Sequence, residues 1–201
     1  MLFVFLAGLV VAGCFFAAHR VFAMKKWSAG RKQFWGDGIG AIFALSLFLC
    51  LELLLQHTLG NSFYSLWRDG SMLPRELFII GALQGIVYEY VGQFTYPLWY
   101  YPQGEVRRWM LLGLPLFWGV FMLIMQDTWA LYRWLGAGTA VAFVLTALTQ
   151  YGLIEGFNLI THSWKYKGWA NTPYFLIIGW FILVLTFVCI TNHVLGSPFG
   201  V

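Results

Sequence analysis

The chain has 201 residues, of which 60% are hydrophobic, 20% are aromatic and only 10% are charged. A soluble globular domain carries about 25% charged residues, so this chain cannot build a water-facing surface and lipid is expected to cover most of it. The net charge of +4 does not indicate a nucleic-acid partner, because the basic residues fall in short connectors between apolar runs.

Six apolar segments predict an all-α integral membrane bundle, since a spanning helix needs about 20 mostly apolar residues. They cover residues 2–18, 39–59, 77–94, 110–126, 136–160 and 174–195, within a single transmembrane domain over 1–201. The first segment contains Val11-Ala12-Gly13-Cys14, which matches a lipoprotein cleavage box. No basic residue precedes Arg20, however, so we expect a retained helix and not a signal peptide.

The charges of the connectors predict the orientation, because basic connectors stay on the cytoplasmic side. The connectors after the first, third and fifth helices hold nine basic residues: Arg20, Lys25, Lys26, Arg31, Lys32, Arg107, Arg108, Lys165 and Lys167. The opposite connectors hold three, which are Arg68, Arg75 and Arg133. We therefore expect an integral protein of the bacterial cytoplasmic (inner) membrane with both termini on the outer side.

Two stretches of the chain resemble each other and predict a parallel repeat of a helical hairpin, over residues 39–101 and 109–166. Each stretch has a Gln, a Glu five residues later, a Thr six residues after the Glu, and then Trp-x-Tyr. The matched pairs are Gln84/Gln150, Glu89/Glu155, Thr95/Thr161 and Trp99/Trp164. The second and fourth helices are also predicted to end alike, at Gln56-His57-Thr58 and Gln126-Asp127-Thr128.

Three glutamates, Glu52, Glu89 and Glu155, lie inside predicted membrane helices. A charge at the centre of a bilayer costs roughly 2.5–3.5 kcal/mol on insertion scales, so such residues usually face the interior and have a partner. Helical spacing places Glu89 on one face with Gly85, Gly92 and Gln93, where the glycines would let another helix approach closely. The same spacing groups Glu155 with Gly152, Asn158 and His162, and Glu52 with Gln56.

We expect these polar side chains to line an intramembrane cavity that binds a small lipophilic or cationic ligand. The predicted ligand-binding residues are Glu89, Gln93, Gln150, Glu155, Asn158, Glu52 and Gln56. Acid–base chemistry on such a ligand is a hypothesis within this interpretation, and whether the chain is an enzyme stays open. The alternatives are an accessory subunit of a larger membrane complex and a proton-linked transporter; glutamates that only hold helices together would suit the first. The expected partners are membrane lipid, a lipophilic small molecule, and a membrane-protein partner or a second copy.

The sequence does not specify a cofactor. Four histidines lie near helix ends, His19 and His162 on one side and His57 and His193 on the other. One pair at each face would suit two b-type haems, although the usual pair of well-separated histidines on one helix is absent. Cys14, Cys50 and Cys189 lie in apolar segments without paired spacing and are expected to be packing residues. No HExxH, CxxC, Walker or GxSxG pattern occurs.

The second half resembles a family of small uncharacterised multi-pass membrane proteins of spore-forming bacteria, over about Thr95 to Leu185. The residues that carry the resemblance are Tyr96-Pro97, Tyr101-Pro102, Glu155, Thr161, Tyr166 and Trp169. It implies a membrane location and no activity. The chain is also similar to the sterol-isomerase-like membrane fold, through Leu66-Trp67-Arg68, Gln150-Tyr151-Gly152 and Pro173-Tyr174-Phe175. That fold holds lipophilic amines or sterols over intramembrane acids but has four or five helices, whereas six are expected here.

Overall fold

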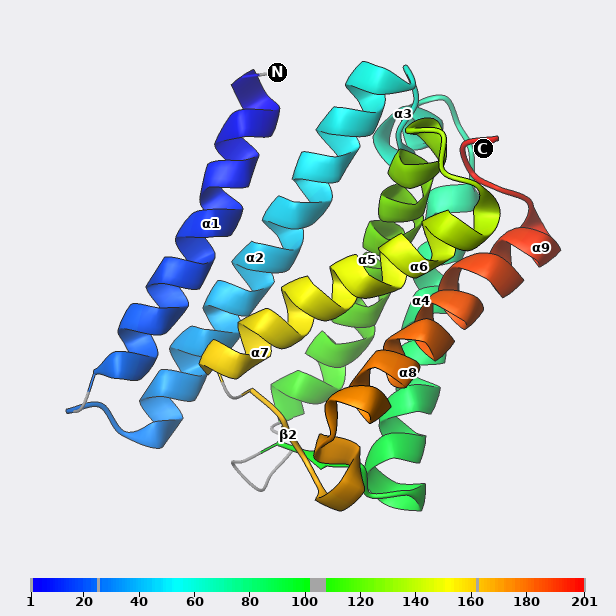
Figure 1. The fold of residues 1–201 in the computed structure, drawn as a ribbon. Helices are drawn as coiled ribbons and strands as arrows, with labels where there is room; N and C mark the ends of the chain where they lie inside the picture. The colour runs from blue at the N-terminus through cyan, green and yellow to red at the C-terminus, as the bar shows by residue number, and fades with distance from the viewer. Residues whose placement is uncertain (1, 25, 102–107, 162, 201) are drawn as a thin grey trace.

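The computed structural model describes residues 2–24, 26–101, 108–161 and 163–200, and it is an all-α bundle (Figure 1). The long helices are α1 (Leu2–Ala23), α2 (Ala29–Thr58), α4 (Leu73–Tyr90), α5 (Arg108–Trp134), α6 (Thr139–Gln150) and α8 (Pro173–Val184). The short helices are α3 (Phe63–Arg68), α7 (Gly156–Thr161), α9 (Thr191–Leu195) and the 3₁₀ turn η3 (Gly168–Asn171). Three π-helical turns, η1 (Val91–Thr95), η2 (Tyr151–Glu155) and η4 (Leu185–Ile190), continue α4, α6 and α8.

Six helical stretches among the described residues are long and apolar enough to cross a membrane. They cover 4–23, 34–58, 73–95, 113–134, 139–161 and 174–195. The predicted class of fold, an all-α bundle with six candidate membrane-spanning helices, is therefore confirmed.

Several predicted helix ends were wrong, because polar residues were taken as the end of a helix. The first helix continues beyond residue 18 to Ala23, and the second begins at Ala29, ahead of the predicted residue 39. The fourth helix was expected to end at Gln126, but α5 continues to Trp134. The next helix breaker is Gly136, which has a positive φ of 88°. Asp127 consequently lies inside a helix and not at its end, so this part of the proposed repeat does not hold.

The bundle has two distinct ends (Figure 1). Both chain termini lie at one end, here called the terminal end, together with α3. Two short strands, β1 (Trp99–Tyr100) and β2 (Lys165–Tyr166), lie at the opposite end, here called the strand end. The strands pair antiparallel, with Trp99 opposite Tyr166 and Tyr100 opposite Lys165. Termini at one end agree with an even number of spans, and which end faces the cytoplasm stays a prediction.

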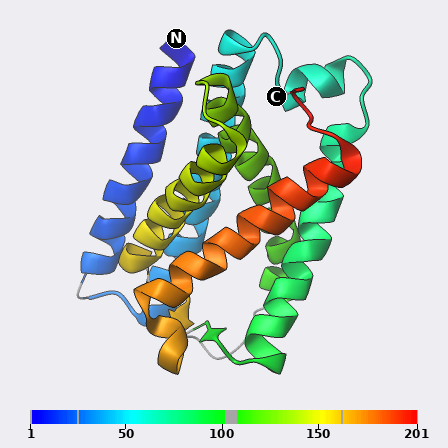
Figure 2. The same cartoon turned by 45° about the vertical axis from the view of Figure 1, so that its right-hand side comes forward.

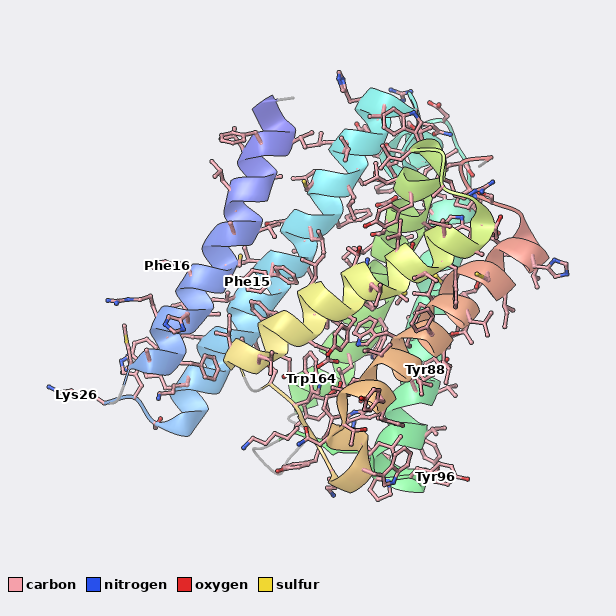
Figure 3. The ribbon with its side chains drawn as sticks, viewed as in Figure 1. Phe15, Phe16, Lys26, Tyr88, Tyr96 and Trp164 are labelled. Carbon is pink, nitrogen blue, oxygen red and sulfur yellow. The ribbon has the colours of Figure 1, made fainter. Side chains whose placement is uncertain are left out.

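The core of the bundle is built around α5. This span has 61% of its most apolar stretch buried, against 39% or less for the other five. Phe121, Met122, Ile124 and Met125 on α5 are 1% exposed or less. By contrast, α1 lies at the side of the bundle along α2. Its Phe15 packs against Phe43 and Phe157, whereas Phe16 is 68% exposed and points away (Figure 3).

Candidate functional site

A cavity of about 530 Å³ lies at the strand end of the bundle. Its walls come from α2, α4, α5, α7, α8 and both strand segments, and they include four tryptophans, Trp99, Trp118, Trp164 and Trp180. Two of the predicted glutamates, Glu89 and Glu155, line this cavity together with Asp37. No Lys, Arg or His is found among the described residues that line it. The cavity is therefore aromatic and acidic, with no basic side chain among those residues.

Glu89 is held by four neutral donors. Its Oε2 accepts hydrogen bonds from Gln93 Nε2 at 2.6 Å and Trp99 Nε1 at 3.2 Å. Its Oε1 accepts from Tyr101 Oη at 3.0 Å and Trp118 Nε1 at 3.2 Å. A carboxylate offers about four acceptor positions, and these four donors occupy them. The arrangement suits a negative charge stabilised by hydrogen bonds alone.

Two glycines bring the tryptophans to Glu89. A Cβ added at Gly85 would collide with the Trp118 side chain, and one added at Gly92 would collide with the ring of Trp99. The indoles therefore lie directly on the backbone of α4 and η1, close to the carboxylate one turn away. The prediction that these glycines would let another helix approach closely is confirmed at Gly85, which meets Trp118 of α5. At Gly92 the close neighbour is Trp99 of β1 and not a helix.

Glu155, the other glutamate of the cavity wall, is held by a similar set of side chains. Its Oε1 accepts from Tyr166 Oη at 2.6 Å and from Trp180 Nε1 on α8 at 3.2 Å. Asn158, one helical turn after Glu155, accepts the backbone N–H of Trp164 on its Oδ1 at 3.1 Å. Trp164 Nε1 donates to Tyr166 Oη at 2.9 Å and so does not reach the carboxylate directly.

The strand pair joins the two clusters. Trp99, a donor to Glu89, lies opposite Tyr166, the donor to Glu155, and their ring centroids are 6.5 Å apart in an edge-to-face arrangement. Figure 3 shows Trp164 just after α7 at the strand end and Tyr88 on α4 beside α8. The two clusters are thus parts of one site, and not two independent helix contacts.

The pKa values of Tyr101 and Tyr166 are both raised by this environment. Burial raises the pKa of Tyr101 well above its usual value of about 10, and the negative charge of Glu89 raises it further. Burial likewise raises the pKa of Tyr166, with the charge of Glu155 as the second cause. The phenols are therefore held as neutral donors, as their hydrogen bonds to the carboxylates require.

The remaining predicted site residues lie outside the cavity wall. Gln93 donates to Glu89 and Asn158 accepts from Trp164, but neither residue lines the cavity. Gln150 is fully buried, and its Nε2 donates to Thr128 Oγ1 at 2.9 Å. Glu52 and Gln56 lie near α3, towards the terminal end, where Glu52 accepts backbone N–H bonds at the start of α3. Gln56 accepts from Ser62 Oγ and donates to the carbonyl of Gly60.

The described histidines do not belong to the cavity. His19, His57 and His193 are all exposed, and none of them lines it. His162, the fourth residue of the haem hypothesis, lies outside the described residues. The part of the chain that the structure describes contains no group of three or more His, Cys, Asp or Glu side chains suited to a metal ion.

The donors to the glutamates were missed as site residues from the sequence. Tyr101 and Tyr166 belong to the Trp-x-Tyr motif, which recurs 12 and 11 residues after the respective glutamate and was the available signal. Trp118 and Trp180 carry no such signal, because their meeting with Glu89 and Glu155 depends on how α5 and α8 pack.

Comparisons with known proteins add no name to this site. No family model matches the chain, and no curated protein and no solved structure matches it. The two resemblances noted from the sequence therefore stay predictions.

Proposed function

We propose that this chain binds a lipophilic organic cation, an amine with an apolar body, in the cavity at the strand end. The observation that carries the proposal is the pair of carboxylates, Glu89 and Glu155, in one cavity walled by tryptophan, tyrosine and phenylalanine. Carboxylates supply negative charge, and aromatic faces attract cations with about 0.5–2 kcal/mol per contact. No basic side chain among the described lining residues competes for either.

The size and composition of the cavity support a ligand with an apolar part. A volume of about 530 Å³ falls within the usual range for small-molecule sites, roughly 300–1,000 Å³. Phe43, Phe117 and Phe121 add apolar surface to the wall. An amine bound at Glu155 would therefore place its alkyl or ring body against apolar side chains, where burial contributes about 25 cal/mol per Å².

The shape of the bundle supports access from the lipid. Tyr88 Oη on α4 lies 2.9 Å from Thr186 Oγ1 on η4. Towards the strand end, α4 and α8 diverge (Figure 2). Ile178 and Ile182 of α8 line the cavity and are 56% and 47% exposed. A ligand dissolved in the membrane would pass between these two helices.

The proposal is tested by measuring binding to the full chain in lipid nanodiscs. The probes are N,N-dimethyldodecylamine, dodecyltrimethylammonium and the neutral dodecanol, with calorimetric titration of empty nanodiscs as the blank. Both cations are expected to bind at least about tenfold more tightly than the alcohol, because cation–π attraction does not need an N–H group. Equal affinity for alcohol and amine would refute the proposal.

Substitution of Glu155 decides whether the charge acts in this cavity. Glu155→Gln is expected to weaken binding of both cations by roughly 30-fold or more, because removing one partner of a buried charge pair costs about 2–5 kcal/mol. Glu76→Gln is the matched control, since Glu76 is exposed in the first turn of α4 and does not line the cavity. Unchanged binding by the Glu155 variant would contradict the proposal.

A further inference from the structure

A fourth acid lies inside the bundle, in a place that the cavity does not reach. Asp127 is on α5, and its side chain is 0% exposed. It does not line the cavity at the strand end. The sequence pattern had put it at the end of a helix, whereas α5 continues for two more turns to Trp134.

Asp127 differs from its neighbours in having no hydrogen-bond partner among the described residues. Gln126 Nε2 donates to the carbonyl of Phe187 at 3.0 Å, and Thr128 Oγ1 donates to the carbonyl of Ile124 at 2.7 Å. Both carboxyl oxygens of Asp127, by contrast, are buried and unpartnered within the described part of the chain. Buried polar groups in proteins are almost always hydrogen-bonded, so this exception requires an explanation.

Glu52, on the helix α2 that packs against α5, is also buried and only 6% exposed. Its two oxygens accept the backbone N–H groups of Phe63 and Tyr64 at 2.9 and 2.8 Å, at the start of α3. Acceptance of N–H bonds by both oxygens suits the charged form of Glu52. A second negative charge on Asp127 would therefore be repelled by the first.

The described basic side chains of α5 and of the helices packed against it are exposed or engaged elsewhere. Arg75 on α4 and Arg31 and His57 on α2 are exposed, Lys32 on α2 donates to the carbonyl of Phe22, and Arg133 on α5 donates to the carbonyl of Ala137. Neither α6 nor η4 contains a basic side chain; α6 has no ionisable residue and η4 has only Cys189. The ion pair found among the described residues joins Arg68 to Asp69, both at the surface. A bare carboxylate at this depth would meet the full desolvation penalty without a partner.

We propose that Asp127 is a proton-binding site, which holds its proton at neutral pH because both of its oxygens are buried without a partner and the charged Glu52 lies on the neighbouring helix α2. The ligand is a proton and not a metal ion, because the described residues offer no set of three acidic, histidine or cysteine ligands. The acid pair then carries one negative charge in place of two. This site is separate from the amine cavity and does not depend on the function proposed for it.

Infrared spectroscopy of the full chain in lipid tests the site directly, because a protonated carboxyl group has a C=O band distinct from that of a carboxylate. The chain has three aspartates, Asp37, Asp69 and Asp127. Aspartate labelled with carbon-13 at its carboxyl group therefore reports on three positions without any substitution. At neutral pH we expect a protonated band that shifts on labelling and in heavy water, and that is lost in Asp127→Asn.

The control is Asp37→Asn, which should leave the band unchanged. The absence of a protonated band that shifts on aspartate labelling would overturn the proposal. Persistence of the shifted band in Asp127→Asn, or its loss in Asp37→Asn, would also overturn it. A band that appears only when sodium is replaced by N-methylglucamine would also overturn it, since a sodium ion would then occupy the site. If Asp127→Asn does not fold, the labelled Asp37→Asn chain still tests the proposal. Its only other aspartate besides Asp127 is Asp69, which is exposed and paired with Arg68.

Discussion

The two glutamates of the cavity are held by matching side chains in two unequal ways. Each accepts a hydrogen bond from the tyrosine of a Trp-x-Tyr motif and from a tryptophan on the helix that follows. Trp99, however, donates directly to Glu89, whereas its counterpart Trp164 donates to Tyr166. Glu89 also receives Gln93, so both of its oxygens are occupied. The donors Tyr166 and Trp180 both bind a single oxygen of Glu155.

Glu89, which has more hydrogen-bond donors than Glu155, also has the more tightly packed glycines around it. Trp118 and Trp99 lie directly on glycines of α4 and η1 in the first cluster. In the second cluster, a Cβ added at Gly179, which lines the cavity, would meet nothing within 4 Å. The glycines of the first cluster are therefore filled by indole rings, whereas Gly179 has open space beside it. We propose on this ground that a ligand binds chiefly at Glu155 and its surroundings.

Conversion of each glutamate to glutamine should separate the two roles. In Glu89→Gln the new NH₂ group must face two donors whichever way the amide points, leaving about two buried donors unpaired at roughly 1–3 kcal/mol each. We expect the free energy of unfolding to fall by about 2–4 kcal/mol. In Glu155→Gln the amide oxygen can keep the bonds from Tyr166 and Trp180, so a loss under about 1 kcal/mol is expected.

Denaturant unfolding of both variants in lipid–detergent micelles, followed by near-ultraviolet circular dichroism, gives the two losses. The wild-type chain and Glu76→Gln serve as references. Equal losses for the two cavity variants would show that the clusters are held equally, and the assignment of the ligand to Glu155 would then lack its basis.

The tyrosines give a second comparison, through pH. Because the pKa values of Tyr101 and Tyr166 are raised in the folded chain, the unfolded chain loses these protons first. Stability should therefore be unaffected below the usual tyrosine pKa of about 10 and should fall above it, by about 1.4 kcal/mol per pH unit for each tyrosine.

Unfolding measured at several pH values between about 9 and 11 checks this sign in the wild type and in each Tyr→Phe variant. Tyr101→Phe and Tyr166→Phe should each remove roughly one tyrosine's share of the slope. The two variants are expected to differ in their stability at neutral pH, where Tyr166→Phe also leaves Trp164 Nε1 without its acceptor. A slope that neither substitution changes would mean that these phenols titrate as in the unfolded chain.

The bundle and two of the three predicted glutamates, Glu89 and Glu155, could be predicted because both depend on local composition. Apolar length identifies a span, and an acid inside a span is expected to face the interior whatever the partner. The Trp-x-Tyr repeat also predicted that the two stretches are equivalent, which agrees with the contacts of Tyr101 and Tyr166. The indoles of Trp118 and Trp180 could not be predicted, because they reach the carboxylates only through the packing of α5 and α8.

At the terminal end of the bundle, two predictions from the sequence were wrong. Gln126-Asp127-Thr128 was interpreted as a polar helix end, and Glu52 was grouped with the ligand site. The structure continues α5 past Asp127 and uses Glu52 at the start of α3. A run of three polar residues inside a membrane helix can be recognised only when the partners of Gln126 and Thr128, on η4 and α6, are known.

Gly179→Phe offers the sharpest test of the difference between the two clusters. Gly179 directly precedes Trp180, just as Phe117 directly precedes Trp118, and Gly179 and Phe117 both line the cavity. The substitution therefore gives the second cluster the phenylalanine that the first cluster already has. A Cβ at Gly179 meets nothing within 4 Å, so the fold should tolerate the ring. The ring would occupy space meant for the ligand, and dimethyldodecylamine binding should weaken by about tenfold, the equivalent of roughly two buried methylene groups. Gly13→Phe is the matched control, because Gly13 on α1 also meets nothing within 4 Å and does not line the cavity. If calorimetry shows the same affinity for both variants and the wild type, the ligand does not bind beside α8, and the space next to Gly179 has another role.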